Sequence, residues 1–149
     1  MLPFAGVVNN LKRIQSDFIE EILKDIVTNN ALEIINLNTK DQLYRDGVNN
    51  EGVDITPSYS NPYKRFKELI NQPSDRVTLK LTGDFHKSFF IDIDNKSFRI
   101  DAKDSKTEGL VKKYGEKIFG LTDSNLGLFK EFIIQPELIE RIKKQILKK

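Results

Sequence analysis

Residues 76–104, RVTLKLTGDFHKSFFIDIDNKSFRIDAKD, decide the fold, because only here do apolar and polar residues alternate clearly. Three runs carry an apolar side chain at every second position, and between the first two Thr82-Gly83-Asp84 has turn chemistry. The apolar positions are Val77, Leu79 and Leu81, then Phe89, Ile91 and Ile93, then Phe98, Ile100 and Ala102. A period of two is typical of a strand with one buried face. We therefore predict a small antiparallel sheet over about residues 76–104.

The last two runs pair in one register on paper. A two-residue turn at residues 95–96 places Ile93 opposite Phe98 and Asp92 opposite Arg99. The aspartate and the arginine then form a favourable cross-strand pair on the wet face. A slip by one residue would set apolar against polar side chains throughout, so the pattern predicts this register.

Helical patterns flank the predicted sheet. From residue 7 to about residue 28 apolar side chains recur at steps of three and four, and over residues 31–45 they recur less regularly. This pattern predicts two helices, or one helix that bends around residues 29–38. Residues 108–149 are also predicted to be helical, with a segment over 108–119, a cap at Thr122 or Asp123, and Pro136 in the first turn of a last helix. These patterns predict an α+β fold in a single domain of residues 1–149.

The segment between the first helical region and the sheet is a predicted loop and a short helix. Residues 47–62 are rich in Gly, Asn, Ser and Pro, and Gly47 ends the preceding helix. Residues 63–70 are predicted to be helical, with an apolar side of Phe66, Leu69 and Ile70 and a basic side of Lys64, Arg65 and Lys67. A loop of this length in a compact domain is usually functional or mobile.

Composition narrows the function classes. The 149 residues are 38% hydrophobic and 31% charged, with a net charge of +2, so the chain has no strong general attraction to nucleic acid or anionic membranes. The absence of cysteine excludes disulfides, thiolate metal sites and cysteine nucleophiles. No run reaches the roughly 18 apolar residues that span a bilayer, and the N-terminus has no signal-peptide pattern. We expect synthesis in the cytoplasm.

The sharpest catalytic pattern is Asp101-Ala102-Lys103 at the end of a predicted strand, with Asp84 or Asp92 upstream. Nucleases of the PD-(D/E)xK kind hold Mg²⁺ with two such carboxylates and stabilise phosphate charge with the lysine. Three matching residues are expected by chance in a chain this rich in charge, and alternation puts Asp92 on a solvated face. The single histidine, His86, follows a turn and is expected to be solvated. We therefore expect no catalytic, cofactor or metal site and keep the Mg²⁺-dependent nuclease as an alternative.

Four segments of the middle of the chain form an ordered set: residues 42–47 (QLYRDG), 49–52 (NNEG), 56–60 (TPSYS) and 79–89 (LKLTGDFHKSF). This order resembles small morphogenesis proteins of tailed bacteriophages, in the tail-completion and head–tail connector (neck) group. Those proteins carry a Gln-aromatic-Gly segment, a Gly-containing loop, a Ser/Thr-Pro step and a Thr-Gly run that opens the sheet. The resemblance covers residues 42–91, about a third of the chain.

The resemblance implies a structural, non-enzymatic virion protein that joins head and tail as a ring oligomer. Its partners would be other copies of itself and neighbouring virion proteins, with no membrane and no specific nucleic-acid partner. A head-to-tail ring uses two different faces of each subunit, and the expected assembly contacts are Gly47, Asn49, Asn50, Gly52, Pro57, Tyr59, Thr82 and Gly83. Besides the nuclease, a small helix-flanked protein-binding module is the other alternative.

Overall fold

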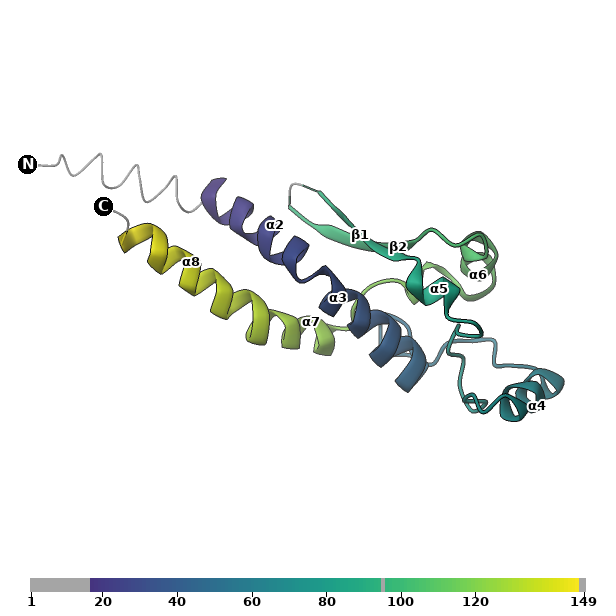
Figure 1. The fold of residues 1–149 in the computed structure, drawn as a ribbon. Helices are drawn as coiled ribbons and strands as arrows, with labels where there is room; N and C mark the ends of the chain where they lie inside the picture. Colours follow the sequence, from purple (N-terminus) through teal and green to yellow (C-terminus); the bar gives the residue numbers. More distant parts are fainter. Residues whose placement is uncertain (1–16, 95, 148–149) are drawn as a thin grey trace, which may run out of the picture.

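Two helical arms and a β-hairpin make up the fold of this computed structural model, which describes residues 17–94 and 96–147 (Figure 1). The N-terminal arm consists of α2 (Ile19–Asn29), α3 (Ala31–Asn36) and the π-helical segment η2 (Leu37–Asp46). The C-terminal arm consists of α7 (Asp123–Phe129), the π-helical segment η4 (Lys130–Ile134) and α8 (Gln135–Leu147). Between the arms in the chain lie α4 (Asn61–Leu69), α5 (Asp84–Lys87), β1 (Phe89–Ile93), β2 (Phe98–Ala102), α6 (Thr107–Tyr114) and a short 3₁₀ turn, η3 (Glu116–Ile118). The predicted α+β fold with a small antiparallel sheet is confirmed.

The arms and the hairpin form layers. Figure 1 shows the N-terminal arm between the hairpin and the C-terminal arm, with α2 and α8 running antiparallel. In agreement, α2 packs against α8 and η4, while α3 packs against β1. The core between these layers consists of side chains that are almost fully buried, among them Ile26, Ile34, Leu43, Ile118 and Phe129.

The hairpin has the predicted register. Ile93 pairs with Phe98, and Asp92 pairs with Arg99. The Arg99 Nε atom lies 3.1 Å from Asp92 Oδ2 on the exposed face, as expected for a cross-strand ion pair. On the other face Phe89 and Ile100 are buried in the core. Of the turn residues, Asn95 lies outside the described residues.

The first predicted strand, residues 77–81, is not a strand. Val77, Thr78 and Leu79 are buried one after another, so alternation fails, and Leu79 has a positive φ of 56°. The backbone N–H groups of Thr78 and Leu79 donate to the Tyr59 hydroxyl at 3.0 and 3.3 Å, and the Thr78 carbonyl accepts from His86 Nε2 at 2.9 Å. Because side chains satisfy these buried backbone groups, the segment needs no neighbouring strand.

The predicted bend in the N-terminal arm lies at Asn30, where φ is −112° and the helix is interrupted between α2 and α3. Its Nδ2 atom donates to the Ile26 carbonyl at 2.8 Å, so the side chain satisfies a carbonyl at the break. The predicted helix starting at residue 7 is confirmed for Ile19–Asn29, and residues 7–16 lie outside the described residues.

The C-terminal arm begins with the predicted cap, since the Thr122 hydroxyl accepts from the Asn125 N–H at 3.1 Å. Pro136 is the second residue of α8, as expected for a helix start, yet η4 joins α7 and α8 without a gap. Proline has no N–H and crowds the carbonyl four residues earlier. A π-helical turn directly before Pro136 accommodates that mismatch, as π-bulges often do.

Two other predicted helices differ from expectation. The helix predicted over residues 108–119 ends at Tyr114, because Gly115 takes a φ of 90° and η3 follows. The helix predicted over 63–70 begins earlier, at Asn61, where the Ser60 hydroxyl accepts from the Tyr63 N–H at 3.4 Å. The predicted loop therefore ends at Ser60, and within it Val48 and Asp54 form one antiparallel bridge.

Candidate functional site

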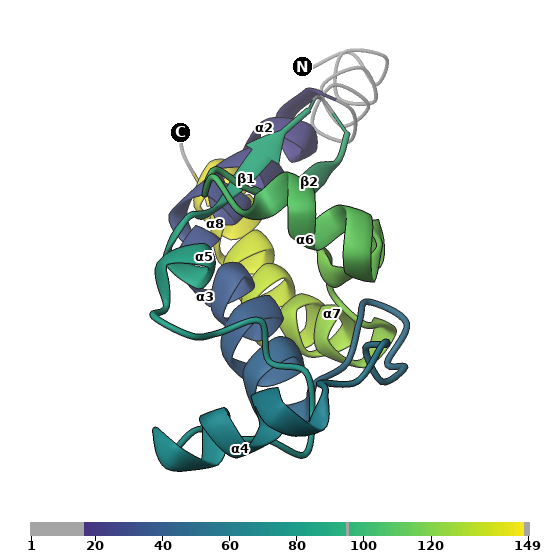
Figure 2. The ribbon, with the colours of Figure 1, turned by 90° about the vertical axis from the view of Figure 1, so that its right-hand side faces the viewer.

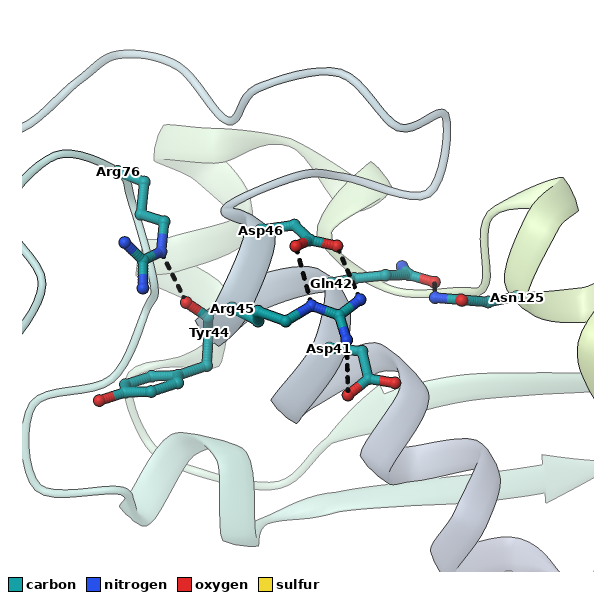
Figure 3. Close-up of polar contacts among 7 residues, drawn as sticks. All are labelled: Asp41, Gln42, Tyr44, Arg45, Asp46, Arg76 and Asn125. Atoms are coloured by element: carbon teal, nitrogen blue, oxygen red, sulfur yellow. Dashed lines mark hydrogen bonds and ion pairs between the residues drawn. The ribbon is translucent and has the colours of Figure 1, made fainter.

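Gly47, an expected assembly contact, is a glycine for reasons that lie within its own chain. It ends η2 in the left-handed region, with a φ of 63°. A Cβ atom on this residue would lie 2.7 Å from Cβ of Arg76, which is too close for two carbon atoms. Arg76 is held in place because its Nε donates to the Tyr44 carbonyl at 2.9 Å (Figure 3). Gly47 therefore serves both the turn and the close approach of the Arg76 side chain.

Hydrogen bonds from its own asparagine side chains fix the loop that contains Asn49, Asn50 and Gly52. The Asn49 carboxamide oxygen accepts from the N–H groups of Glu51 and Val53 at 2.9 and 3.2 Å. Asn50 reaches further, since its N–H donates to the Lys117 carbonyl at 2.8 Å and its Nδ2 to the Phe119 carbonyl at 3.0 Å. Both asparagines therefore point into this chain. Their geometry gives them a structural role.

Gln42 is the centre of a buried amide cluster that sequence reasoning missed. Its side chain is fully buried, and its Nε2 donates to the Gly120 carbonyl at 2.8 Å. Its Oε1 accepts from the Thr122 N–H and from Asn125 Nδ2, both at 2.9 Å. Figure 3 shows the bond to Asn125. Asn38, one turn earlier, bonds the Ile118 carbonyl and the Gly120 N–H at 3.0 and 2.8 Å. The amides of η2 thus hold the main chain that enters the C-terminal arm.

A sequence signal for this cluster existed. Asn38, Thr39 and Gln42 interrupt the apolar period of the N-terminal arm, and all three are buried. Polar residues at positions where a helix should be apolar indicate specific hydrogen-bond partners, because an unpaired buried amide is costly. The neighbouring Arg45 is different, since it forms exposed contacts with Asp46 and Asp41, as Figure 3 shows. The Arg45 hydrogen bond lowers the pKa of Asp46.

Lys67 is buried although helix α4 is at the surface. Its side chain is 0% exposed, and its ammonium donates to Gln72 Oε1 at 2.7 Å and to the Lys80 carbonyl. The rings of Tyr59 and Tyr63 lie 5.5 and 5.7 Å from Nζ, within range of cation–π attraction. Burial lowers the pKa of Lys67. Within the described residues no carboxylate pairs with it, so aromatic faces and carbonyl oxygens stabilise its charge.

The turn residue His86 is half-buried, whereas a solvated side chain was expected. The pKa of His86 is lowered to about 4, mainly by burial and also by the charges of Lys80 and Lys67. Because the Thr78 carbonyl can only accept, Nε2 carries the proton of the neutral ring. His86 is therefore a neutral structural residue at pH 7 that supports the irregular segment 77–80.

Three of the expected contact residues meet at one place. Tyr59, Thr82 and Gly83 line a common pocket between α4, residues 79–83 and α6. Gly83 has a φ of 92°, and the Thr82 hydroxyl accepts from the Asp84 N–H at 3.3 Å, so both residues shape the turn. Gly47 and Asn49 do not line this pocket, and Pro57 is exposed. The eight residues are thus divided between an internally bonded loop and a pocket wall.

The four residues of the nuclease alternative lie on the hairpin, directly after it and in α5. Arg99 lies between two of them, with its guanidinium 3.1 Å from Asp92 and 3.6 Å from Asp101. Lys103 Nζ lies 4.8 Å from the centre of the Phe90 ring, and Asp84 is an exposed residue in the first turn of α5. Across residues 17–94 and 96–147, no group of three or more His, Cys, Asp or Glu side chains is placed to hold a metal ion.

Two apolar surfaces are exposed on different elements. The α4 face consists of Phe66, Leu69 and Ile70, which are 43%, 82% and 39% exposed. The C-terminal face consists of exposed residues at steps of about one and two helical turns on α7, η4 and α8, namely Leu128, Phe132 and Ile139. Figures 1 and 2 show α4 at one end of the molecule, apart from α8. The sequence predicted the apolar side of α4 but not that this side faces solvent.

Comparisons with protein-family models, with curated proteins and with solved structures found no match. Among the described helices, none combines the length and the apolar character needed to cross a membrane. The two apolar surfaces and the elements that hold them are therefore the features of this chain that bear on its function.

Proposed function

We propose that this chain is a non-enzymatic structural protein that assembles with copies of itself into a ring, as a neck or tail-completion component of a tailed phage. The observation that carries the proposal is the pair of exposed apolar surfaces, the α4 face and the C-terminal face. Contiguous exposed apolar side chains commonly mark interaction surfaces. A subunit whose α4 face contacts the C-terminal face of the next copy makes a head-to-tail contact, which closes into a ring at a suitable rotation.

The way α4 is held supports this reading. An amphipathic surface helix normally turns its apolar side to the core. In α4 the buried side chain is Lys67, while Phe66 and Leu69 point outward. The bonds from Lys67 to Gln72 and to the Lys80 carbonyl fix the rotation of the helix about its axis. A rigid, outward apolar face loses little conformational entropy when a partner binds.

The resemblance in residues 42–91 is the reason for proposing that this assembly belongs to a tailed phage. The segments that resemble phage neck and tail-completion proteins flank α4 in the chain: Gln42 and Gly47 anchor the end of η2, and Tyr59 bonds the segment after α4. The proposal therefore assigns these residues to holding the projecting helix, and assigns the contact itself to the α4 face. Deleting the whole loop would be a poor test, because Ile55 within it is buried in the core.

A mixing experiment tests the head-to-tail contact. Leu69→Glu disables the α4 face and Phe132→Glu disables the C-terminal face, and each exposed site tolerates the charge. We expect the wild type to form oligomers larger than a dimer in sedimentation velocity, and each variant alone to remain monomeric. Because each variant keeps one intact face, a mixture of the two should form 1:1 dimers and stop there.

The matched control is Leu32→Glu, which places the same charge on an exposed leucine that belongs to neither face. It should assemble like the wild type. A wild-type chain that stays monomeric at every concentration, or variants that assemble normally, would contradict the proposal. A separate experiment tests whether the protein belongs to a phage particle. Mass spectrometry of purified phage particles should find about 6 or 12 copies of the chain per particle, as expected for a cyclic ring.

A further inference from the structure

A second surface feature is separate from the two apolar faces. The pocket between α4, residues 79–83 and α6 has a volume of about 530 Å³, within the range of small-molecule sites. Three of the four tyrosines of the chain line it: Tyr59, Tyr63 and Tyr114. Leucine and phenylalanine side chains complete the apolar part of the lining. None of Phe66, Leu69 and Ile70 lines the pocket, although the Phe66 ring lies 5.9 Å from the Tyr63 ring in its wall.

The charged groups at this pocket are all positive. Lys80, Lys106 and Lys113 line it, and its lining contains no aspartate or glutamate. Within the described residues, none of these three lysines has a carboxylate oxygen within 4.0 Å of its ammonium. Lys80 and Lys113 instead lie 4.7 and 5.3 Å from the ring centres of Tyr44 and Tyr114. Within the described residues, their charges are therefore not paired with a carboxylate.

The positive region continues behind the pocket wall. The Tyr59 and Tyr63 rings that line the pocket also contact the buried Lys67 ammonium, which has no acidic partner in the described part of the chain. The pKa of His86 is lowered mainly by burial, and Lys80 and Lys67 contribute to the shift. An anion in the pocket would therefore meet a favourable potential from both the wall and the interior.

We propose that this pocket binds a nucleotide unit, with the base against the tyrosine rings and the phosphate at Lys106 and Lys113. Every base has an aromatic face that stacks on tyrosine, and lysine ammonium groups bind phosphate as point charges. The volume of this open pocket suits one nucleotide rather than a long strand. A free mononucleotide and a single unit of a nucleic acid strand share this chemistry, and the test separates them.

Isothermal titration of the full chain at low salt with dTMP is the first measurement. We expect dTMP to bind about tenfold more tightly than thymidine or inorganic phosphate, because each of those keeps only one of the two contacts. Lys113→Gln should weaken dTMP binding about tenfold. The matched control is Lys112→Gln, which removes the same charge from the adjacent exposed residue of α6 that does not line the pocket, and it should leave the affinity unchanged.

A ring variant tests the base contact. Tyr63→Leu should weaken binding of dTMP more than binding of inorganic phosphate, since only the nucleotide uses the ring. An oligothymidylate that binds more tightly than dTMP and is weakened by Lys113→Gln identifies the strand as the source. An oligothymidylate that binds no better than dTMP identifies the free nucleotide. The proposal is overturned if millimolar dTMP does not bind, if Lys112→Gln weakens it as much as Lys113→Gln, or if Tyr63→Leu affects dTMP and phosphate equally.

Discussion

Replacing Gln42 by leucine tests whether the buried amide cluster holds the two arms together. Leucine fills nearly the same volume, so packing is kept while three hydrogen bonds are lost: one to the Gly120 carbonyl and one each from the Thr122 N–H and Asn125 Nδ2. A hydrogen bond contributes about 1 kcal/mol net, and a buried group left unpaired costs more. Gly120, Thr122 and Asn125 are half-buried, so water replaces part of the loss. We expect Gln42→Leu to lower the free energy of unfolding by about 3 kcal/mol.

Urea denaturation followed by far-UV circular dichroism measures this loss as a lower midpoint with an unchanged slope. For a chain of this size the same loss lowers Tm by about 6–12 °C. The control Gln135→Leu makes the same substitution at an exposed position and should change stability by less than about 0.5 kcal/mol. In a double-mutant cycle, Asn125→Ala should cost less in the Gln42→Leu background than in the wild type. If Gln42→Leu unfolds within about 0.5 kcal/mol of the wild type, the cluster does not join the arms.

Three further predictions follow from single positions. Gly47→Ala should lower the free energy of unfolding by about 2 kcal/mol or more, from the left-handed backbone and the overlap with Arg76, and wild-type stability in urea would contradict this. The pKa of His86 in the folded chain, about 4, lies below its usual value of 6.5, so the unfolded state binds more protons between these pH values. The free energy of unfolding should therefore fall by about 3 kcal/mol as the pH drops from 6.5 to 4. The variant His86→Gln should lose that part of the pH dependence. If its pH profile equals that of the wild type, the histidine ring is not buried in its neutral form. Lys67→Ala should speed amide hydrogen exchange throughout α4, because it removes both bonds that fix the helix; unchanged exchange there would show that other contacts hold it.

The proposed assembly and the proposed nucleotide pocket use different parts of one structural unit. Helix α4 presents its apolar face outward, and its Tyr63 ring lines the pocket and lies 5.9 Å from the Phe66 ring of that face. Lys67 lies between them and determines the rotation of the helix. A change at Lys67 should therefore disturb both sites, whereas Leu69→Glu and Lys113→Gln should each affect one only. These two charge changes therefore allow the two proposals to be tested apart.

Local sequence determined the features that depend on residues a few positions apart. The register of the hairpin followed from alternation in two adjacent runs, and the structure pairs Asp92 with Arg99 as predicted. The cap at Thr122 and the left-handed end of η2 at Gly47 depend on one residue each and on the backbone directly around them. In each case the stabilising partner lies within the same element or the next one.

Only the tertiary structure decided which polar residues would be buried and which apolar residues would be left in solvent. Gln42 is buried because its partner carbonyl, that of Gly120, comes from 78 residues away. The alternating segment 77–81 failed as a strand because Tyr59 and His86 satisfy its backbone from outside any ladder. Lys67 is buried because the Gln72 side chain and the Lys80 carbonyl accept hydrogen bonds from its ammonium. The sequence pattern shows which side chains are polar, but not which of them will find a hydrogen-bond partner. A buried polar group is stable only where the folded chain supplies that partner.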